Sequence, residues 1–209
     1  MLKGLNHKEL TISLIRKFSS FTYLNITQFL GALNDNIFKL LIVYQFIELE
    51  GIEASHSILA ITGAIFVLPF LLFSASSGTL ADRFSKRNII LATKILELIT
   101  MLLGVLAFAN HSKWGSYAIL FLLATQSAVF GPSKYGILPE LVPSDKISKA
   151  NGLMTSFTFL AIIMGTFCAS FLIEITGRNF IFASLFCSAI ALAGVITSYC
   201  IEYTPPTGT

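Results

Sequence analysis

The fold of this chain is decided by a short charged segment, Gly78-Thr79-Leu80-Ala81-Asp82-Arg83-Phe84-Ser85-Lys86-Arg87. It stands between two long apolar runs: residues 57–80 have no charged side chain, and residues 88–110 have only Lys94 and Glu97. Because an α-helix needs about 20 apolar residues to cross the hydrocarbon core of a bilayer, each run is long enough to span a membrane. The segment is therefore predicted to be a tight loop between two transmembrane helices.

The composition of the whole chain agrees with this. Hydrophobic residues make up 55% of the 209 residues and charged residues 12%, whereas a soluble domain carries about 25% charged residues. The apolar runs are continuous and lack the alternation of a barrel strand. The sequence therefore predicts an all-α membrane protein with six spans, at about 18–47, 57–80, 88–110, 114–137, 150–173 and 179–201.

Lysine and arginine residues gather in alternate loops. One side of the membrane would hold Lys3, Lys8, Arg16, Lys17, Arg83, Lys86, Arg87, Lys134, Lys146 and Lys149, and the other side only Lys113 and Arg178. Because cytoplasmic loops carry an excess of Lys and Arg, we expect residues 1–17 to form a cytoplasmic tail, and residues 204–209 to begin a linker on the same side. The net charge of +3 thus reports topology; without a basic face, no nucleic-acid partner is expected.

The first span carries a polar stripe at helical spacing, formed by Asn25, Gln28, Ala32, Asp35 and Lys39. An ionisable group near the middle of a span costs about 2.5–3.5 kcal/mol on insertion scales, so this stripe is expected to face protein or a water-filled cavity. Asp35 could line a transport path and couple to a cation, a proton or a substrate headgroup. It could instead form a structural pair with Lys39, one turn further along.

Three other charged residues lie in or near the spans. Lys94 and Glu97 are three residues apart, which predicts a self-neutralising pair on one helix face, although Lys94 could also extend to the cytoplasmic surface. Lys134, at the inner end of the fourth span, is either a cation that reaches the membrane surface or one that meets an anionic headgroup. Glu140 is expected to be solvated or paired within its loop.

Motifs of enzymes are not found. The sequence has no Ser-His-Asp set, no zinc-ligand spacing and no phosphate-binding glycine loop, so no catalytic residue, metal site or cofactor is predicted. The three cysteines lie in apolar spans and are interpreted as packing residues.

Small residues and prolines predict details of helix packing. Gly165 with Ala169 in the fifth span, and Ala189 with Ala193 in the sixth, would form faces for close helix contact. Gly131-Pro132 is expected to break or bend the fourth span.

The charged segment resembles the signature of the major facilitator superfamily between its second and third helices: a glycine, three residues, Asp-Arg, one residue, a glycine, then two basic residues. Gly78, Asp82, Arg83, Lys86 and Arg87 fit, and Ser85 departs from the family glycine, which suggests a looser turn. The resemblance implies that these residues form a gating motif, in which Asp82 and Arg83 contact a helix of a second half.

Two further segments, QFLGALNDN at 28–36 and FGPSKYGILPE at 130–140, resemble the lysophospholipid transporters of bacterial inner membranes. This resemblance implies a lyso-phosphatidylethanolamine type of substrate, with Asp35 and Lys134 in the lipid path. Two alternatives stay open. One is a transporter of the same fold that exports a drug, a siderophore or another small molecule, and the other is a membrane anchor for a fused acyl-transfer enzyme.

Family resemblance also implies the architecture. Such transporters pair two six-helix halves, each built from two inverted three-helix repeats around a central site. This chain is expected to be the N-terminal half, with its C-terminal partner missing. Its first and fourth spans should line the cavity, its second and fifth should face the missing half, and its third and sixth should lie outward.

Overall fold

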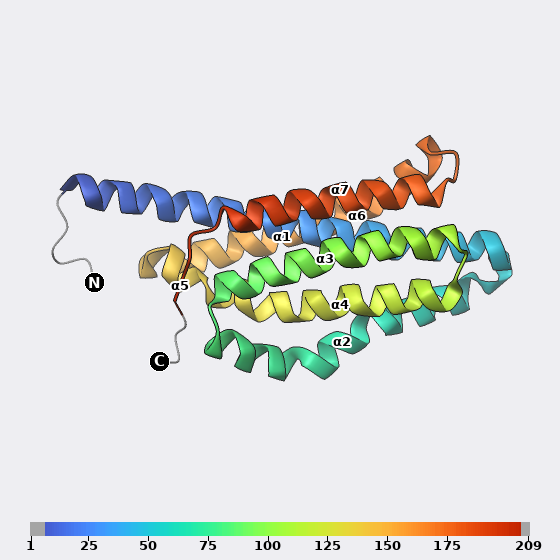
Figure 1. Cartoon of the computed structure of the whole chain (residues 1–209), viewed down its shortest axis with the longest axis horizontal. Helices are drawn as coiled ribbons and strands as arrows, with labels where there is room; N and C mark the ends of the chain where they lie inside the picture. Colours follow the sequence, from blue (N-terminus) through green and yellow to red (C-terminus); the bar gives the residue numbers. More distant parts are fainter. Residues whose placement is uncertain (1–6, 206–209) are drawn as a thin grey trace.

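The computed structural model describes residues 7–205, with side chains from residue 17 onward. The described residues form seven α-helices: α1 (His7–Glu50), α2 (Ser55–Arg83), α3 (Lys86–Ala109), α4 (Lys113–Gly136), the one-turn α5 (Leu138–Leu141), α6 (Ile147–Ile175) and α7 (Phe180–Tyr199). The six long helices lie side by side in one elongated bundle (Figure 1). Of these, α2, α3, α4, α6 and α7 are long and apolar enough to cross a membrane. The predicted all-α membrane fold is confirmed.

Helix contacts reveal the internal repeat. The main packing pairs are α2 with α4, α1 with α6, α3 with α7, α3 with α4, and α1 with α7. If α1 is exchanged with α4, α2 with α6 and α3 with α7, the same set of contacting pairs results. Because each unit has three helices, the second unit starts at the opposite end of the bundle from the first. The half is therefore a 3+3 inverted repeat, as the family resemblance implied.

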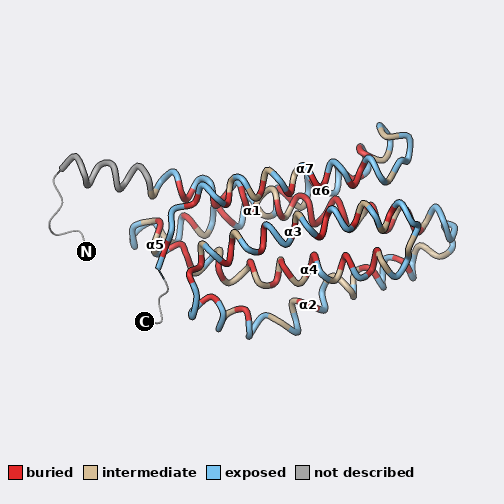
Figure 2. Tube along the Cα trace, viewed as in Figure 1, coloured by how far each residue is buried: buried red, intermediate tan, exposed pale blue. Residues whose placement is uncertain are grey.

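Helix α1 lies at the centre of the packing. Its fully buried apolar side chains, among them Leu24, Ile37, Phe38, Leu41 and Phe46, contribute to both hydrophobic clusters. The second helix of each repeat is the most exposed: of 29 residues each, α2 has five buried and α6 has six. Exposed residues recur along the length of α2 in Figure 2. The central helix thus holds the polar stripe inside the bundle, while α2 and α6 offer apolar surface to lipid or to another partner.

The ends of the chain differ from the predicted layout. Helix α1 begins at His7, so most of the predicted tail, residues 1–17, continues the first helix beyond the predicted start of the span. Residues 1–6 lie outside the described part. Of the predicted linker, 204–209, only Thr204 and Pro205 are described, and both have irregular backbone.

The charged segment is mostly helical, which corrects the prediction of a loop from Gly78 to Arg87. Helix α2 continues to Arg83, α3 begins at Lys86, and only Phe84 and Ser85 connect them. Ser85 has φ −57°, and its side chain accepts a hydrogen bond from the Asn88 backbone N–H as an N-cap. Since this backbone conformation suits any residue, no glycine is needed there, and the expected loosening of the turn is absent at the described link.

Of the packing expectations, one was wrong and one was wrong in part. Helix α4 is not broken at Gly131-Pro132, because it continues through Pro132 to Gly136. The small-residue face of α7 is not formed by Ala189, which is exposed, and Ala193, which is half-buried. The buried small residues lie on a different face of the helix, at Ala183, Cys187, Ala191 and Gly194. The face on α6 is as predicted, since Gly165 and Ala169 are both buried.

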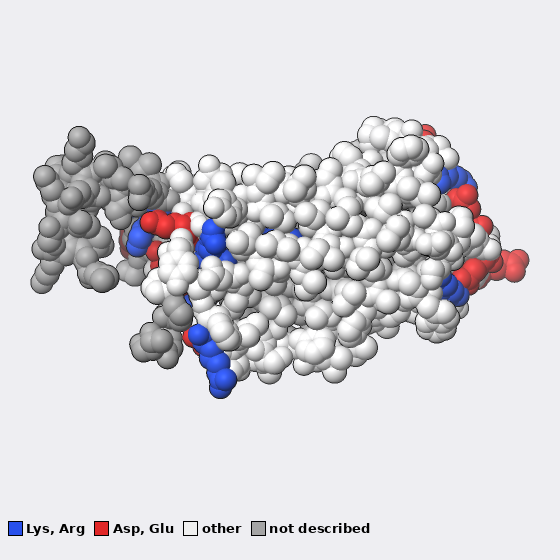
Figure 3. Space-filling view, in the orientation of Figure 1, with Lys and Arg blue, Asp and Glu red and all other residues white. Residues whose placement is uncertain are grey.

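Charged side chains gather at the two ends of the bundle. On the face shown in Figure 3, a broad band almost without charge separates them. At the end where α1 finishes, Lys113 pairs with Glu50 at 2.6 Å and Arg178 with Glu48 at 3.8 Å. This pattern is the one expected for a bundle that has lipid around its middle and water at both ends.

Replacing Gly165 with Ala should destabilise the bundle. A methyl group there would lie 2.8 Å from the Leu33 carbonyl oxygen and 2.9 Å from Asn36 Cβ, at the contact between α1 and α6. We expect a loss of roughly 1–3 kcal/mol, measured by denaturation of the purified protein in detergent. Gly152→Ala on the same helix is the control: it meets no atom within 4 Å, so Ala should be neutral or stabilising by up to about 1 kcal/mol. Equal stability of the two variants would contradict the close approach.

Candidate functional site

The inner part of the polar stripe is tied to α6. Asn25 and Gln28 are buried, and Gln28 donates hydrogen bonds to the Met154 carbonyl oxygen (2.9 Å) and to Asn25 Oδ1 (3.2 Å). The Asn25 amide in turn donates to the Phe21 carbonyl oxygen. Gln28 therefore joins α1 to α6, and Asn25 holds the Gln28 amide from within α1. The stripe does face protein, as its spacing indicated.

Asp35 lies against α4. Ser127 Oγ donates a 2.6 Å hydrogen bond to Asp35 Oδ2, and Gln126 Nε2 donates to Ser127 Oγ at 2.8 Å. The carboxylate is 7% exposed, and its other oxygen, Oδ1, has no hydrogen-bond partner in the described part of the chain. A buried carboxylate is thus held at one oxygen and left with a free acceptor at the other.

Lys39 does not form the pair with Asp35 that the spacing allowed. Its ammonium donates to Asn36 Oδ1 at 3.1 Å and lies 4.8 Å from the centre of the Phe66 ring on α2. Asn36 is itself held by a bond from its amide to the Ala32 carbonyl oxygen. Because the Lys39 ammonium contacts Asn36 and Phe66 instead, Asp35 lacks the partner that the structural-pair interpretation requires.

Lys94 and Glu97 form a fully buried ion pair. Lys94 Nζ lies 2.5 Å from Glu97 Oε2, and the side chains are 2% and 1% exposed. Asn34 on α1 donates to Glu97 Oε1 at 3.1 Å. The ammonium sits against Gly31, where a side chain would collide with it, and 4.9 Å from the Phe130 ring centre on α4. The pair therefore joins α1, α3 and α4 in the middle of the bundle.

Lys134 is surrounded by aromatic rings. Its ammonium lies 5.8 Å from the Phe130 ring centre and 5.0 Å from that of Tyr135. Phe130 thus contacts both Lys94 and Lys134. Among residues 17–205, no acidic group lies within ion-pair distance of Lys134. A half-buried ammonium on aromatic faces, without a counter-ion, is suited to bind an anion.

The charges around Asp35 do not balance. Asp35 and Glu97 bring two negative charges, whereas Lys39, Lys94 and Lys134 bring three positive ones; Glu97 and all three lysines act electrostatically on Asp35. The region therefore has one excess positive charge when every group is ionised. An incoming group with a negative charge would neutralise it.

The gating motif divides into two parts. Asp82 and Arg83 are exposed at the end of α2, and Gly78 has open space where a side chain would be. Lys86 instead pairs with Glu140 at 2.9 Å, and Arg87 donates to the backbone oxygens of Ile201 (3.2 Å) and Tyr199 (2.9 Å), at the end of α7. The first part faces outward, and the second fastens α3 to α5 and α7.

Sequence reasoning missed the partners that position the charges. Ser127 and Gln126 hold Asp35, and Gly31 makes room for Lys94. The three consecutive polar residues Thr125, Gln126 and Ser127, in the middle of an uncharged run, were the available signal. Glu140 was expected to be solvated or paired within its loop, but it pairs with Lys86, which lies on another helix, α3.

Comparisons with known proteins now bear on this geometry. Residues 24–208 match the family model described as Major Facilitator Superfamily. A lysophospholipid transporter of Photorhabdus laumondii is 32% identical over 84% of this chain and 41% of its own length, and one of Klebsiella pneumoniae is 30% identical over 82% and 40%. The chain therefore spans about two fifths of the curated relatives that it matches.

A solved structure shares the fold. It is a peptide transporter, POT, in complex with sulfate; the TM-score is 0.63, with 19% identity, over 86% of this chain and 37% of that one. At this identity the likeness concerns the fold alone.

The buried pair gives a test of its structural role. Glu97→Gln keeps the shape of the side chain but leaves the Lys94 ammonium buried without a counter-charge, so we expect a loss of about 3 kcal/mol or more in the free energy of unfolding. Adding Lys94→Met should restore much of it, because no uncompensated charge then remains. With Lys94→Met alone as the third variant, denaturation of the original protein, the two single variants and the double variant in detergent forms a double-mutant cycle. If Glu97→Gln is as stable as the original protein, the pair does not hold the helices together.

Proposed function

Because the chain belongs to the major facilitator superfamily, we propose that it is the N-terminal half of a secondary transporter for lysophospholipid of the lyso-phosphatidylethanolamine type. The transporter would move its substrate across the bacterial inner membrane by alternating access, with the N-terminus of this half in the cytoplasm. The observation that carries the substrate class is the pair of unmatched charges in the bundle: Asp35, with a free carboxylate oxygen, and Lys134, without a counter-ion.

A zwitterionic headgroup suits these two charges. Its phosphate would meet the Lys134 ammonium, and its own ammonium would meet Asp35 Oδ1. The excess positive charge of the region favours the phosphate, and charge-assisted hydrogen bonds are about twice as strong as neutral ones. The curated relatives are named lysophospholipid transporters, which agrees with this chemistry.

Apolar helix surface would accept the acyl chain. Large apolar side chains make up much of the exposed surface of α2 and α6, and they include Leu71, Leu72, Ile163, Phe167 and Phe171. An acyl chain can therefore stay in lipid or against this surface, beside the second half, while the headgroup enters the polar region. A substrate with a charged end and a long apolar end thus matches the polar region at Asp35 and Lys134 and the apolar surface of α2 and α6.

The second half would dock on α2 and α6. The small residues that precede the gating motif on α2, Ser74, Ala75 and Ser76, are exposed, and Gly78 offers open space. In membranes, such small-residue faces allow close helix approach. We place the partner helix of Asp82 and Arg83 there, so that these residues would bridge the halves when the cytoplasmic side closes.

Asp35→Asn should abolish uptake. The amide keeps the size of the side chain and can still accept the Ser127 hydrogen bond, but it cannot pair with an ammonium group. Uptake of labelled lyso-phosphatidylethanolamine would be measured in bacterial cells that lack their own transporter and express the protein carrying this chain. The amount of the variant in the membrane should be unchanged. Asp145→Asn, at an exposed acid of the 3-10 turn before α6, is the control. Normal uptake by Asp35→Asn would rule out its role.

Lys134→Gln should weaken substrate binding. Losing a hydrogen bond between charged groups costs about 1.5–3 kcal/mol, so the concentration for half-maximal uptake should rise at least about tenfold. Lys134→Arg keeps the charge and should retain most of the affinity, whereas Lys149→Gln, at an exposed cation on α6, should have no effect. An unchanged half-maximal concentration in Lys134→Gln would place the phosphate elsewhere.

A further inference from the structure

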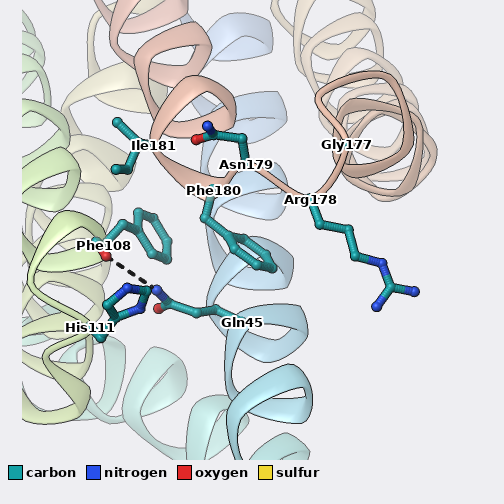
Figure 4. Close-up of a pocket in the computed structure, with 8 residues that line it drawn as sticks. All are labelled: Gln45, Phe108, His111, Gly177, Arg178, Asn179, Phe180 and Ile181. Atoms are coloured by element: carbon teal, nitrogen blue, oxygen red, sulfur yellow. Dashed lines mark hydrogen bonds between the residues drawn. The ribbon is translucent and has the colours of Figure 1, made fainter.

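A recess lies at the end of the bundle where α1 finishes and α7 begins. Its volume is about 290 Å³, and it is lined by Gln45, Phe108, His111, Gly177, Arg178, Asn179, Phe180 and Ile181 (Figure 4). None of the residues proposed for the transport path lines it. It lies at the opposite end of the molecule from Asp82 and Arg83, on the side that the lysine and arginine distribution predicts to be outside.

Gln45 contributes an unpartnered acceptor to this recess. The residue is 2% exposed, and its Nε2 donates to the Phe108 carbonyl oxygen at 3.5 Å (Figure 4). This bond fixes the orientation of the amide, because only the nitrogen of the Gln45 amide can donate to a carbonyl oxygen. Gln45 Oε1 has no partner within residues 17–205. A buried acceptor without a donor is costly, so the recess is suited to a ligand that donates a hydrogen bond.

The opposite wall is the N-terminus of α7. Asn179 is its N-cap and accepts from the Phe182 backbone N–H at 3.2 Å. The first-turn N–H groups of Phe180 and Ile181 have no acceptor inside the helix, and the helix dipole gives this end a partial positive charge. Asn179, Phe180 and Ile181 all line the recess. This wall is suited to the oxygens of an anion.

His111 and Arg178 complete the rim in different ways. The His111 ring lies beside the Gln45 amide, so it can supply a further N–H (Figure 4). The Arg178 guanidinium points away from these two residues, toward Glu48, at 3.8 Å. Gly177 and Arg178 both have positive φ, 60° and 63°, and this backbone turn brings the loop over the recess.

The depth of the recess is that of lipid headgroups. Trp114, the only tryptophan of the chain, lies 82% exposed on the first turn of α4, and Phe182 is 63% exposed on the first turn of α7. Exposed aromatic residues at helix ends, tryptophan above all, mark the interface between hydrocarbon and water. The recess opens at this level, among the same helix ends.

We propose that this recess binds a phosphate ester whose neighbouring group donates a hydrogen bond, as phosphoethanolamine does. The phosphate oxygens accept from the first turn of α7 and from His111, and the ammonium group donates to Gln45 Oε1. The source is either the headgroup of a phospholipid in the adjacent leaflet or a soluble phosphate ester. The site uses no residue of the transport path and stands independently of the proposed transport function.

The test is titration of phosphoethanolamine and phosphocholine into the purified protein in detergent, followed by calorimetry. We expect saturable binding and a preference for phosphoethanolamine, since the quaternary ammonium of phosphocholine has no N–H for Gln45. Gln45→Leu should weaken phosphoethanolamine binding about tenfold and remove the preference. Tyr44→Phe is the matched control: it removes one polar atom at the adjacent position, which contacts Ser170 instead, and both affinities should stay unchanged.

Two further measurements make the result decisive. Ile181→Phe should fill the recess from its wall on α7 and prevent binding without adding a polar group. This variant covers the case that Gln45→Leu fails to fold. In nanodiscs of phosphatidylethanolamine, loss of phosphoethanolamine binding identifies the lipid headgroup as the occupant, and retained binding identifies a soluble ester. No saturable binding by the original protein, or unchanged affinity and preference in Gln45→Leu, would overturn the site.

Discussion

The buried pair of Lys94 and Glu97 is the constraint on which the centre of this half depends. In a bundle surrounded by lipid, water does not compensate a charge at this depth, so both groups need partners within the protein. Lys94 and Glu97 pair with each other, Asn34 of α1 donates to Glu97, and the ring of Phe130 on α4 lies by the Lys94 ammonium. Gly31 must stay without a side chain for the ammonium to fit. The register of α1 against α3 is therefore fixed by a polar contact where apolar packing alone would allow sliding.

That register decides where Asp35 lies. One residue after Asn34, its carboxylate is carried onto α4, where Ser127 takes one oxygen and leaves the other open. Asn34, which binds the structural pair, and Asp35, the proposed headgroup contact, are thus adjacent residues of one helix that face different neighbours. A functional side chain needs neighbouring contacts that hold it in position, and the Asn34 contact with Glu97 does this for Asp35.

The sequence predicted the parts of the fold that depend on length and charge. Apolar runs of membrane length located α2, α3, α4, α6 and α7, and the family signature implied the inverted repeat. The sequence could not predict which face of α7 is buried. In lipid both faces of a helix are apolar, and the small residues Ala189 and Ala193 look like the buried Ala183 and Ala191. The turn at Ser85 was misjudged, since the family pattern suggests a glycine but only the backbone angle shows that none is needed. Partners from other helices, such as Ser127 for Asp35, depend on the rotation of each helix, which spacing within one segment does not contain.

The two ends of the bundle are fastened by different kinds of contact. At the end with the gating motif, Arg87 binds backbone oxygens at the end of α7, and Lys86 pairs with Glu140 in a mostly buried position. At the other end, Glu48 and Glu50 hold the two loops through pairs that are open to water. Dissolved ions screen exposed pairs over about 8 Å at physiological ionic strength and affect buried ones much less. The stiffness of the half is therefore unequal along its length, and the salt content of the compartment beyond Glu50 sets how firmly those two loops are held.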